Sequence, residues 1–373
     1  MVDPPERIDC PRPRRIVLGQ LGARGDCVYA TAVARQIKAD YPGCRLTWAI
    51  GSMARSIIAN NPYVDEVWEI PVRNHGEMLA AWEQFRKEVT ARKARGDFDD
   101  VFLTQVYPDN FGNYDGTVRA SIFRGYPRPI TVPVTPVIRL SREQVDATAE
   151  FVARHRLTDY TTVILFECAS ASGQSFVTPE FALEVARGIV AVHPHTAVVL
   201  SSSVSVSSGD PRIIDGSGLP FDCNAELTKS CSLLIGCSSG ISWLASSDWA
   251  KPLPQIQLLR RDTSVFASFV HDHEYFGLPT DQIIEMTDCP ARRVVECVAV
   301  IRTEGFGAAR KTFHEEIALR FDHYVYILFG FGWRRGGWRV VLHSMRNTVS
   351  RYGLRPQMLI AACRVLWGKL VKS

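Results

Sequence analysis

The sequence predicts an α/β protein of two consecutive domains, each built around a parallel sheet, followed by a basic helical tail. Short apolar runs alternate with helical stretches of roughly 10–20 residues, as in βαβ units with right-handed crossovers. A proline-rich segment at 126–141 interrupts this pattern, which then restarts. At 373 residues the chain is also long enough for two domains of ordinary size.

The first domain is expected to span residues 1–140. Strands are predicted at 14–20, 45–50, 64–70 and 97–105, and helices at 26–40, 53–61 and 75–95. Prolines cannot lie in a central strand, so 126–141 is interpreted as an edge segment leading into a linker. The hinge between the domains is therefore expected near 135–145.

The second domain is expected to span residues 141–305 and the tail residues 306–373. Strands are predicted at 161–167, 196–202, 233–239, 254–259 and 282–287, and helices at 142–156, from 178, at 225–232, at 241–250 and at 290–303. Open α/β sheets bind ligands at the carboxyl ends of their strands. A cleft between the two domains is therefore the expected ligand site.

Composition is typical of a cytoplasmic globular protein. The ten cysteines are scattered, form no C-x-x-C pair and fall mostly in apolar runs, which favours buried, reduced thiols. The first fifteen residues lack the apolar core of a signal peptide, so secretion is not expected. No window reaches the ~18 apolar residues that a membrane span requires.

The tail differs from the rest of the chain in charge. Residues 309–373 carry twelve Lys or Arg against three acids, a net charge of +9, and no acid follows Asp322. Basic helices bordered by Trp are typical of peripheral membrane anchors. The alternative is a helix pair packed on the body with solvated arginines, and no motif supports nucleic-acid binding. One face of the tail is predicted to hold Trp338, Val341, Leu342, Met345 and Val349.

A glycine-rich turn, "GQLGARGD", follows the first strand and allows the backbone to approach another group closely. The glycines lie at 19, 22 and 25, which is not the G-x-G-x-x-G spacing of a dinucleotide site, and no Lys-Ser/Thr follows as in a P-loop. Asp26 either caps the next helix or acts as a general base in the cleft. The helix N-terminus is expected to keep its carboxylate ionised.

Two blocks of sequence resemble glycosyltransferase family 9, the lipopolysaccharide heptosyltransferases. In the first half the resemblance rests on the strand and Gly-Asp turn, the "YPG" turn after the helix, and the segment "NPYVDEVWEI". In the second half, "ASASGQSFVTPEFALEVARGI" is placed like the family's nucleotide-binding loop, and "LLIGCSSGISWLAS" like its strand-to-helix segment. The resemblance runs from about residue 14 to 300 and leaves the tail without a counterpart.

The resemblance implies a GT-B fold, in which two Rossmann-like domains face a central cleft, with the donor on the C-terminal and the acceptor on the N-terminal domain. It also implies a single displacement that inverts the anomeric centre, with Asp26 deprotonating the acceptor hydroxyl. Backbone N–H groups and a helix dipole, rather than a metal, would stabilise the leaving nucleoside diphosphate. No metal or other cofactor is therefore expected.

The expected donor site departs from the family in two places. A His of the family is replaced by Trp243, which either stacks on a base or sugar or fills the core, and the Lys of the nucleotide loop is missing. The charge of the diphosphate must then be met elsewhere, with Arg212, Lys251, Arg260 and Arg261 as candidates. The predicted donor-binding residues are Gln174, Ser175, Ser238, Ser239, Gly240, Ile241, Ser242, Trp243 and Arg260.

The acceptor site is expected at the turn after the first strand and in the loop 104–126, where aromatic, amide and acidic groups suit a sugar. The predicted residues are Gly22, Arg24, Gly25, Tyr107, Asp109, Asn110, Tyr114, Asp115 and Arg119. The alternative for this loop is a solvated surface segment. No metal site is expected at 271–274, since adjacent residues point in different directions.

Together these observations predict an inverting, metal-independent glycosyltransferase of bacterial cell-surface polysaccharide biosynthesis. It would use a nucleotide sugar and a glycan or lipid-linked acceptor on the cytoplasmic face of the inner membrane, which the tail would contact peripherally. Two alternatives remain open at this point. One is a nucleotide-sugar epimerase of the same fold, and the other is a catalytically degenerate relative that binds nucleotide or glycan or acts as a scaffold.

Overall fold

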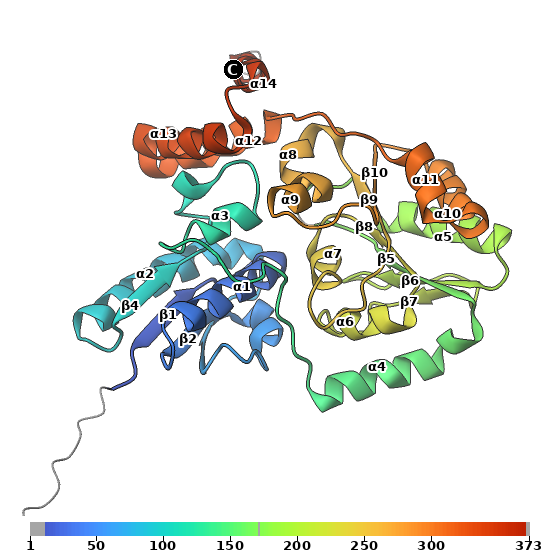
Figure 1. The fold of residues 1–373 in the computed structure, drawn as a ribbon, viewed down its shortest axis with the longest axis horizontal. Coiled ribbons are helices and arrows are strands. Elements are labelled where there is room, and N and C mark those ends of the chain that lie inside the picture. The colour runs from blue at the N-terminus through green and yellow to red at the C-terminus, as the bar shows by residue number, and fades with distance from the viewer. Residues whose placement is uncertain (1–11, 171, 371–373) are drawn as a thin grey trace, which may run out of the picture.

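The computed structural model describes residues 12–170 and 172–370 and contains two parallel sheets in two domains. The first domain and the second lie side by side, and the helical tail crosses one end of both (Figure 1). Every predicted strand is present, but the structure adds β7 (Ile213–Asp215) and the short helices α3 (Arg119–Phe123), α8 (Ser264–Ala267) and α9 (Phe269–Tyr275), which were not predicted.

The first sheet has the order β3-β2-β1-β4, built from β1 (Arg15–Gly19), β2 (Arg45–Gly51), β3 (Glu66–Ile70) and β4 (Asp100–Leu103). Side chains alternate between its faces. Ile16 and Leu18 pack in the core that includes α1 (Arg24–Asp40). Val17 packs on the opposite face with Trp82 of α2 (Met78–Ala94). Burial on both faces explains why the central strands β1 and β2 are mostly apolar, whereas the edge strand β3 is largely exposed and carries two glutamates.

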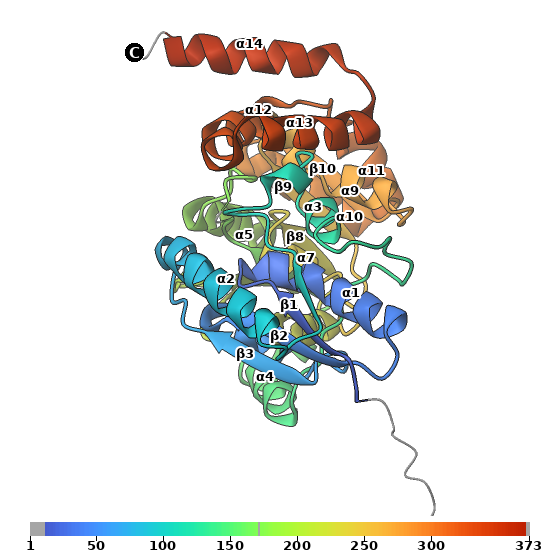
Figure 2. The same cartoon turned by 90° about the vertical axis from the view of Figure 1, so that its left-hand side faces the viewer.

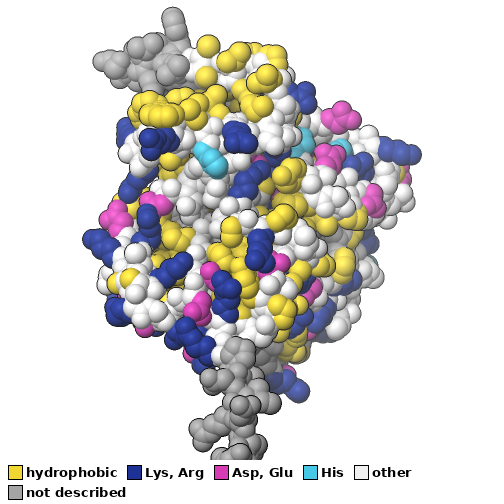
Figure 3. All heavy atoms as spheres, turned by 60° about the vertical axis from the view of Figure 1, so that its left-hand side comes forward, with side chains coloured by type: hydrophobic (Ala, Val, Ile, Leu, Met, Phe, Trp, Pro, Cys, Tyr) yellow, Lys and Arg dark blue, Asp and Glu magenta, His cyan; other side chains and the backbone are white. Residues whose placement is uncertain are grey.

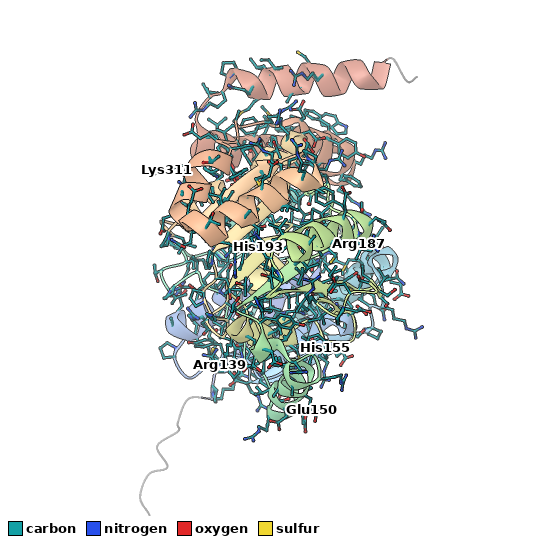
Figure 4. The ribbon with its side chains drawn as sticks, turned by 90° about the vertical axis from the view of Figure 1, so that its right-hand side faces the viewer. Arg139, Glu150, His155, Arg187, His193 and Lys311 are labelled. Atoms are coloured by element: carbon teal, nitrogen blue, oxygen red, sulfur yellow. The ribbon has the colours of Figure 1, made fainter. Side chains whose placement is uncertain are left out.

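The second sheet has the order β10-β9-β8-β5-β6-β7. Its strands are β5 (Thr162–Glu167), β6 (Thr196–Ser201), β7 (Ile213–Asp215), β8 (Leu233–Gly236), β9 (Gln255–Leu259) and β10 (Ile283–Thr287). One face is covered by α5 (Pro179–Val192), α10 (Ala291–Glu304) and α11 (Phe306–Phe313), and the other by α4 (Arg142–Arg154), α6 (Cys223–Leu227) and α7 (Gly240–Leu244). Arg187, His193 and Lys311 lie on the outer side of this domain, away from the first one (Figure 4).

The proline-rich segment contains no strand, so the expected edge segment is replaced by an irregular connection. It is held to both domains by hydrogen bonds. The Oγ1 of Thr31 in α1 accepts a hydrogen bond from the N–H of Val137 at 2.8 Å, and the N–H of Ile138 donates to Asp248 at 3.1 Å. The capping box of Ser141 and Gln144 then begins α4, which packs on α6 of the second domain.

The tail consists of α12 (Asp322–Ile327), a π-helical turn (Leu328–Gly332), α13 (Trp333–Tyr352) and α14 (Pro356–Leu370). It packs on both domains, because its core cluster includes Tyr114 of the first domain and Val265 of the second. No helix among residues 12–170 and 172–370 is long and apolar enough to cross a membrane. Figure 2 shows α13 against the body, with α14 beyond it.

Candidate active site

A cavity of about 710 Å³ lies between the two domains, within the range typical of ligand sites. It is formed by the turn after β1 and the start of α3 (Arg119–Phe123) on one side, and by the segments after β5, β6 and β8 on the other. This is the expected position, at the carboxyl ends of parallel strands. Ten of the predicted site residues line it: Arg24, Gly25, Asp26, Arg119, Gln174, Ser238, Ser239, Gly240, Ile241 and Trp243.

The glycine-rich turn brings the two domains into backbone contact. A Cβ atom at Gly25 would lie 3.7 Å from the Cα of Gly240, the first residue of α7. At Gly19 a Cβ would meet the side chain of Leu103 at 2.7 Å, and at Gly22 that of Met78 at 2.7 Å. None of the three turn glycines has a positive φ. They therefore serve close packing rather than a left-handed turn.

Asp26 is the third residue of α1, which begins two residues earlier than predicted, so the interpretation of Asp26 as the helix cap is wrong. Ala23 occupies the cap position, and its N–H donates a hydrogen bond to the Asp26 carboxylate. Desolvation outweighs this bond and raises the pKa of Asp26 to about 7. The expectation that the helix start keeps this group ionised is therefore corrected. A carboxyl with a pKa near 7 is well suited to accept a proton.

Arg24 lies beside Asp26 and reaches toward the second domain. Its Nε donates to the carbonyl of Met53 at 2.9 Å, and its guanidinium carbon lies 5.4 Å from the centre of the Phe221 ring. The described part of the chain contains no ion pair to Arg24. An exposed guanidinium in this position has N–H groups free for an anionic ligand.

The start of α7, predicted to bind the diphosphate, is already capped by a carboxylate of the chain. Glu167, the last residue of β5, accepts hydrogen bonds from the N–H of Ile241 at 2.8 Å and from the hydroxyl of Ser242 at 2.6 Å. Burial raises the pKa of Glu167. While Glu167 is ionised, a diphosphate at the same amides would face a like charge, so Ser242 and these N–H groups are not free to bind it.

Ser238 is held in a left-handed conformation on the wall of the cavity, with φ of 49°. Its carbonyl accepts hydrogen bonds from Nε2 of Gln174 at 3.0 Å and from Nε1 of Trp243 at 3.3 Å. Its N–H donates to Gln257 at 2.7 Å. Non-glycine residues persist in this region only where neighbours fix them, and such positions cluster at functional sites.

Arg119 joins the domains and is only 1% exposed. Its Nη2 lies 3.0 Å from Oδ2 of Asp272, across the interface. Its guanidinium carbon lies 5.1, 4.8 and 5.2 Å from the ring centres of Tyr29, Trp243 and Phe276. We call these five residues the interdomain latch.

Trp243 fills the domain interface rather than offering a free face to a base or sugar. Its ring stacks on Phe269 at 3.8 Å, and Tyr29 and Arg119 pack against it. Of the two alternatives from the sequence, the structure supports the core position. No group of three His, Cys, Asp or Glu that could hold a metal occurs in the described residues, 271–274 included.

Several predicted acceptor residues are placed outside the cavity. Asp109 accepts a hydrogen bond from Nε1 of Trp82 at 2.7 Å, and the side chain of Asn110 donates to the carbonyl of Gln105 at 2.8 Å. Tyr107 is exposed against the tail, and Gly22 packs inside the first domain.

Tyr114 and Asp115 are buried beneath the tail. The carboxylate of Asp115 pairs with Arg124 at 2.7 Å and with Arg351 of α13 at 3.2 Å. These cations hold the pKa of Asp115 below its usual range, although burial acts against them. Asp115 therefore attaches the tail to the loop 104–126 and has no access to the cavity.

The remaining donor candidates also lie away from the cavity. The hydroxyl of Ser175 donates to Leu258, and Arg260 lies 3.5 Å from Asp262. Arg212 pairs with Asp210, and the structure likewise leaves Arg261 and Lys251 outside the lining. Arg24 is thus the exposed cation among the described lining residues.

Sequence reasoning missed Glu167, the serine run after β6, and Phe221 and Asn224, all of which line the cavity. The ends of β5 and β6 carried a usable signal. Both are polar positions directly after apolar strands, "VILFE" and "VVLSSS", at the edge where parallel sheets bind ligands.

The facing of two Rossmann-like domains across this cavity defines the GT-B fold. Two solved structures share it. One is a family 9 glycosyltransferase from Veillonella parvula, with 15% identity and a TM-score of 0.53, the match covering 81% of this chain and 90% of that one. The other is the ADP-heptose lipopolysaccharide heptosyltransferase II of E. coli, with 13% identity, a TM-score of 0.50, and coverage of 78% and 99%.

No family model matches the sequence, and no curated protein matches it either. The two solved structures nevertheless confirm the resemblance to family 9 at the level of fold. Donor, acceptor and reaction are not fixed by likeness at this identity.

Proposed function

We propose that this protein is an inverting, metal-independent glycosyltransferase that moves a sugar from a nucleotide sugar to a glycan or lipid-linked acceptor. The observation that carries the proposal is the position of Asp26. Its carboxyl lies in the interdomain cavity, opposite the start of α7, with a pKa near 7. The fold shared with glycosyltransferases supports the same reaction class.

In the proposed reaction, Asp26 takes the proton of an acceptor hydroxyl as the oxygen attacks the anomeric carbon. The new C–O bond forms while the bond between that carbon and the phosphate oxygen breaks. The nucleoside diphosphate leaves with the electron pair, and a single displacement inverts the anomeric centre. A general base of this kind contributes about 10²–10⁴-fold to the rate.

Arg24 is proposed to bind the diphosphate, because it is the exposed cation next to Asp26. Hydrogen-bonding groups of Gln174, Ser238 and Ser239 on the opposite wall would contact the nucleotide or its sugar. The acceptor would enter beside Gly25 and Arg24 of the first domain. An acceptor from bacterial surface-polysaccharide biosynthesis, lipopolysaccharide-like, is inferred from the heptosyltransferase likeness. ADP-heptose itself is not assigned, since the family Lys and His are both replaced.

The first test is a thermal-shift titration with ADP-, GDP-, UDP-, CDP- and dTDP-sugars. A ligand that binds only the folded protein raises its melting temperature by mass action, so one base is expected to give a selective shift. Arg24→Gln should weaken that shift, whereas Arg260→Gln, which removes an arginine outside the cavity, should leave it unchanged. Transfer then requires a new glycosidic product with inverted configuration by NMR. A product in which only the donor sugar is epimerised identifies the epimerase alternative.

A second candidate, a degenerate relative that binds nucleotide or glycan, is favoured by one observation. Glu167 occupies the N–H groups at the start of α7, where the resemblance places the diphosphate. If nucleotide sugars stabilise the protein but neither transfer nor hydrolysis follows with any acceptor, this candidate replaces the transferase. Absence of any shift removes the nucleotide-sugar proposal altogether.

A further inference from the structure

The outer side of α13 carries an apolar stripe that no other part of the described chain covers. It consists of Trp338, Leu342 and Met345, which are 57%, 54% and 46% exposed. The spacing of four and three residues places them on one helical face. Hydrophobic side chains gather over α13 and α14 (Figure 3). Most of the exposed large hydrophobic side chains of the described chain lie in the tail: Tyr326, Phe331, Trp333, Trp338, Leu342, Met345, Leu354, Leu359 and Ile360.

The stripe corrects the face predicted from sequence. Val341, expected beside Trp338 and Leu342, is buried against the body. The inner face of α13 is instead formed largely by polar residues, including Ser344 and Thr348. The helix therefore turns mainly polar groups toward the protein, while large apolar side chains and arginines share its solvent side.

Hydrogen bonds fix α13 in this orientation. The hydroxyl of Ser344 donates to the carbonyl of Tyr114 at 2.6 Å, and the side chain of Asn347 donates to the carbonyl of Gly112 at 2.8 Å. Nη1 of Arg351 donates to Oγ1 of Thr117 at 2.7 Å. Rotating the helix to bury the stripe would break all three bonds and expose the Arg351–Asp115 pair. The stripe is thus held outward.

The charges around the stripe indicate the kind of surface that it binds. Arg339 and Arg346 are exposed on the same helix, and no acid follows Asp322. Lys and Arg side chains appear beside the hydrophobic gathering in Figure 3. Trp at the border of an apolar face and cations around it match the headgroup region of a bilayer with anionic lipids. A protein partner or a second copy would leave this one-sided charge uncompensated unless its own surface were acidic.

We propose that Trp338, Leu342 and Met345 insert into the boundary between headgroups and acyl chains of an anionic membrane, with Arg339 and Arg346 on the lipid phosphates. The same helix contacts the loop 104–126 at Thr117, and Thr117 and Arg119 of this loop line the cavity. Docking thereby sets the acceptor side of the cavity at a fixed position relative to the bilayer. Membrane binding itself does not depend on the proposed transfer reaction and is measured without substrate.

The test is flotation of the full chain with vesicles of phosphatidylcholine alone or mixed with phosphatidylglycerol. Binding to the anionic vesicles is expected, with loss as salt is raised. Changing Trp338, Leu342 and Met345 together to Ser should reduce binding about tenfold or more, since each side chain loses its apolar transfer into lipid. The control changes Val192 and Val204 to Ser, because both are similarly exposed, at 58% and 57%, in the second domain.

The melting temperature of the triple variant should stay unchanged, because the three side chains are already in water. Arg339→Gln with Arg346→Gln should weaken binding to anionic vesicles while leaving the stripe intact. Undiminished binding by the triple variant overturns the proposal. So does a wild-type dimer in light scattering that the triple variant converts to monomer, which would assign the stripe to a second copy.

Discussion

Replacing Asp26 by Asn should make the protein more stable at alkaline pH while abolishing transfer. Asn keeps the shape of the side chain and removes its charge. The carboxyl has a pKa of about 7 in the folded protein, against 3.8 in the reference state. A raised folded-state pKa means that folding favours the protonated form. The stabilisation from Asp26 is therefore complete below pH 3.8 and is lost as pH rises through 7.

The size of this effect follows from the pKa difference. About three pKa units at 1.36 kcal/mol each give an upper limit of about 4 kcal/mol. Asp26 keeps some contact with solvent in the cavity, which screens the ionised form. We therefore expect Asp26→Asn to raise the free energy of unfolding at pH 8 by about 1–3 kcal/mol, and at pH 5 by about two fifths of that, because at pH 5 Asp26 is already ionised in the unfolded chain but still protonated in the folded one.

Urea denaturation at pH 5 and pH 8 measures both values on the same protein. Glu285, whose pKa burial also raises to about 7, contributes equally to wild type and variant and cancels in the difference. Glu143→Gln is the matched control, because Glu143 lies in the first turn of α4 and is exposed. It should lower stability by about 0.3–1 kcal/mol through the lost interaction with the helix dipole. A variant at Asp26 that is no more stable at pH 8 refutes the assignment of the raised pKa.

Three further results are expected. Arg119→Met should lower the free energy of unfolding in urea by about 3–5 kcal/mol, because it leaves Asp272 buried and unpaired. Adding Asp272→Asn should recover part of this loss. If the single and double variants are equally unstable, the prediction is contradicted. Arg351→Met should loosen the tail and speed its removal by limited proteolysis, since Asp115 loses a buried partner. Nucleoside diphosphate should bind more weakly at pH 8 than at pH 6 by calorimetry, because Asp26 becomes negative beside Arg24, and Asp26→Asn should remove this dependence.

The sheets were predictable because their strands are apolar runs bounded by turns and separated by amphipathic helices. β7 was missed since three residues carry no periodic signal. The start of α1 was misplaced by two residues because Ala23 caps it without a capping side chain. The turn after the first strand correctly predicted that Asp26 lies at the interdomain cavity. The place of Glu167 at the end of β5 could have been read from sequence, but its contact with Ile241 could not, because it depends on the pairing of β5 with β8.

The tail was misjudged for a related reason. A hydrophobic pattern on a helix indicates two faces but does not say which one meets the protein. On α13 the side chains of Ser344 and Asn347 donate hydrogen bonds to backbone carbonyls of the loop 104–126, and these bonds decide which face packs on the protein. The sequence does not reveal such contacts. The large apolar side chains are left outside as a result.

This arrangement decides how the tail should be studied. Deleting 323–373 is expected to release the protein from membranes, but the deletion would also uncover Tyr114 and Val265 and leave Asp115 without Arg351. Loss of membrane binding in such a protein would then not distinguish a missing anchor from a damaged fold. The loop that α13 holds continues into Arg119 and the interdomain latch, so the cavity itself would be disturbed. Substitutions on the outer face alone separate the two effects, because they change what meets the bilayer and leave every inner contact in place.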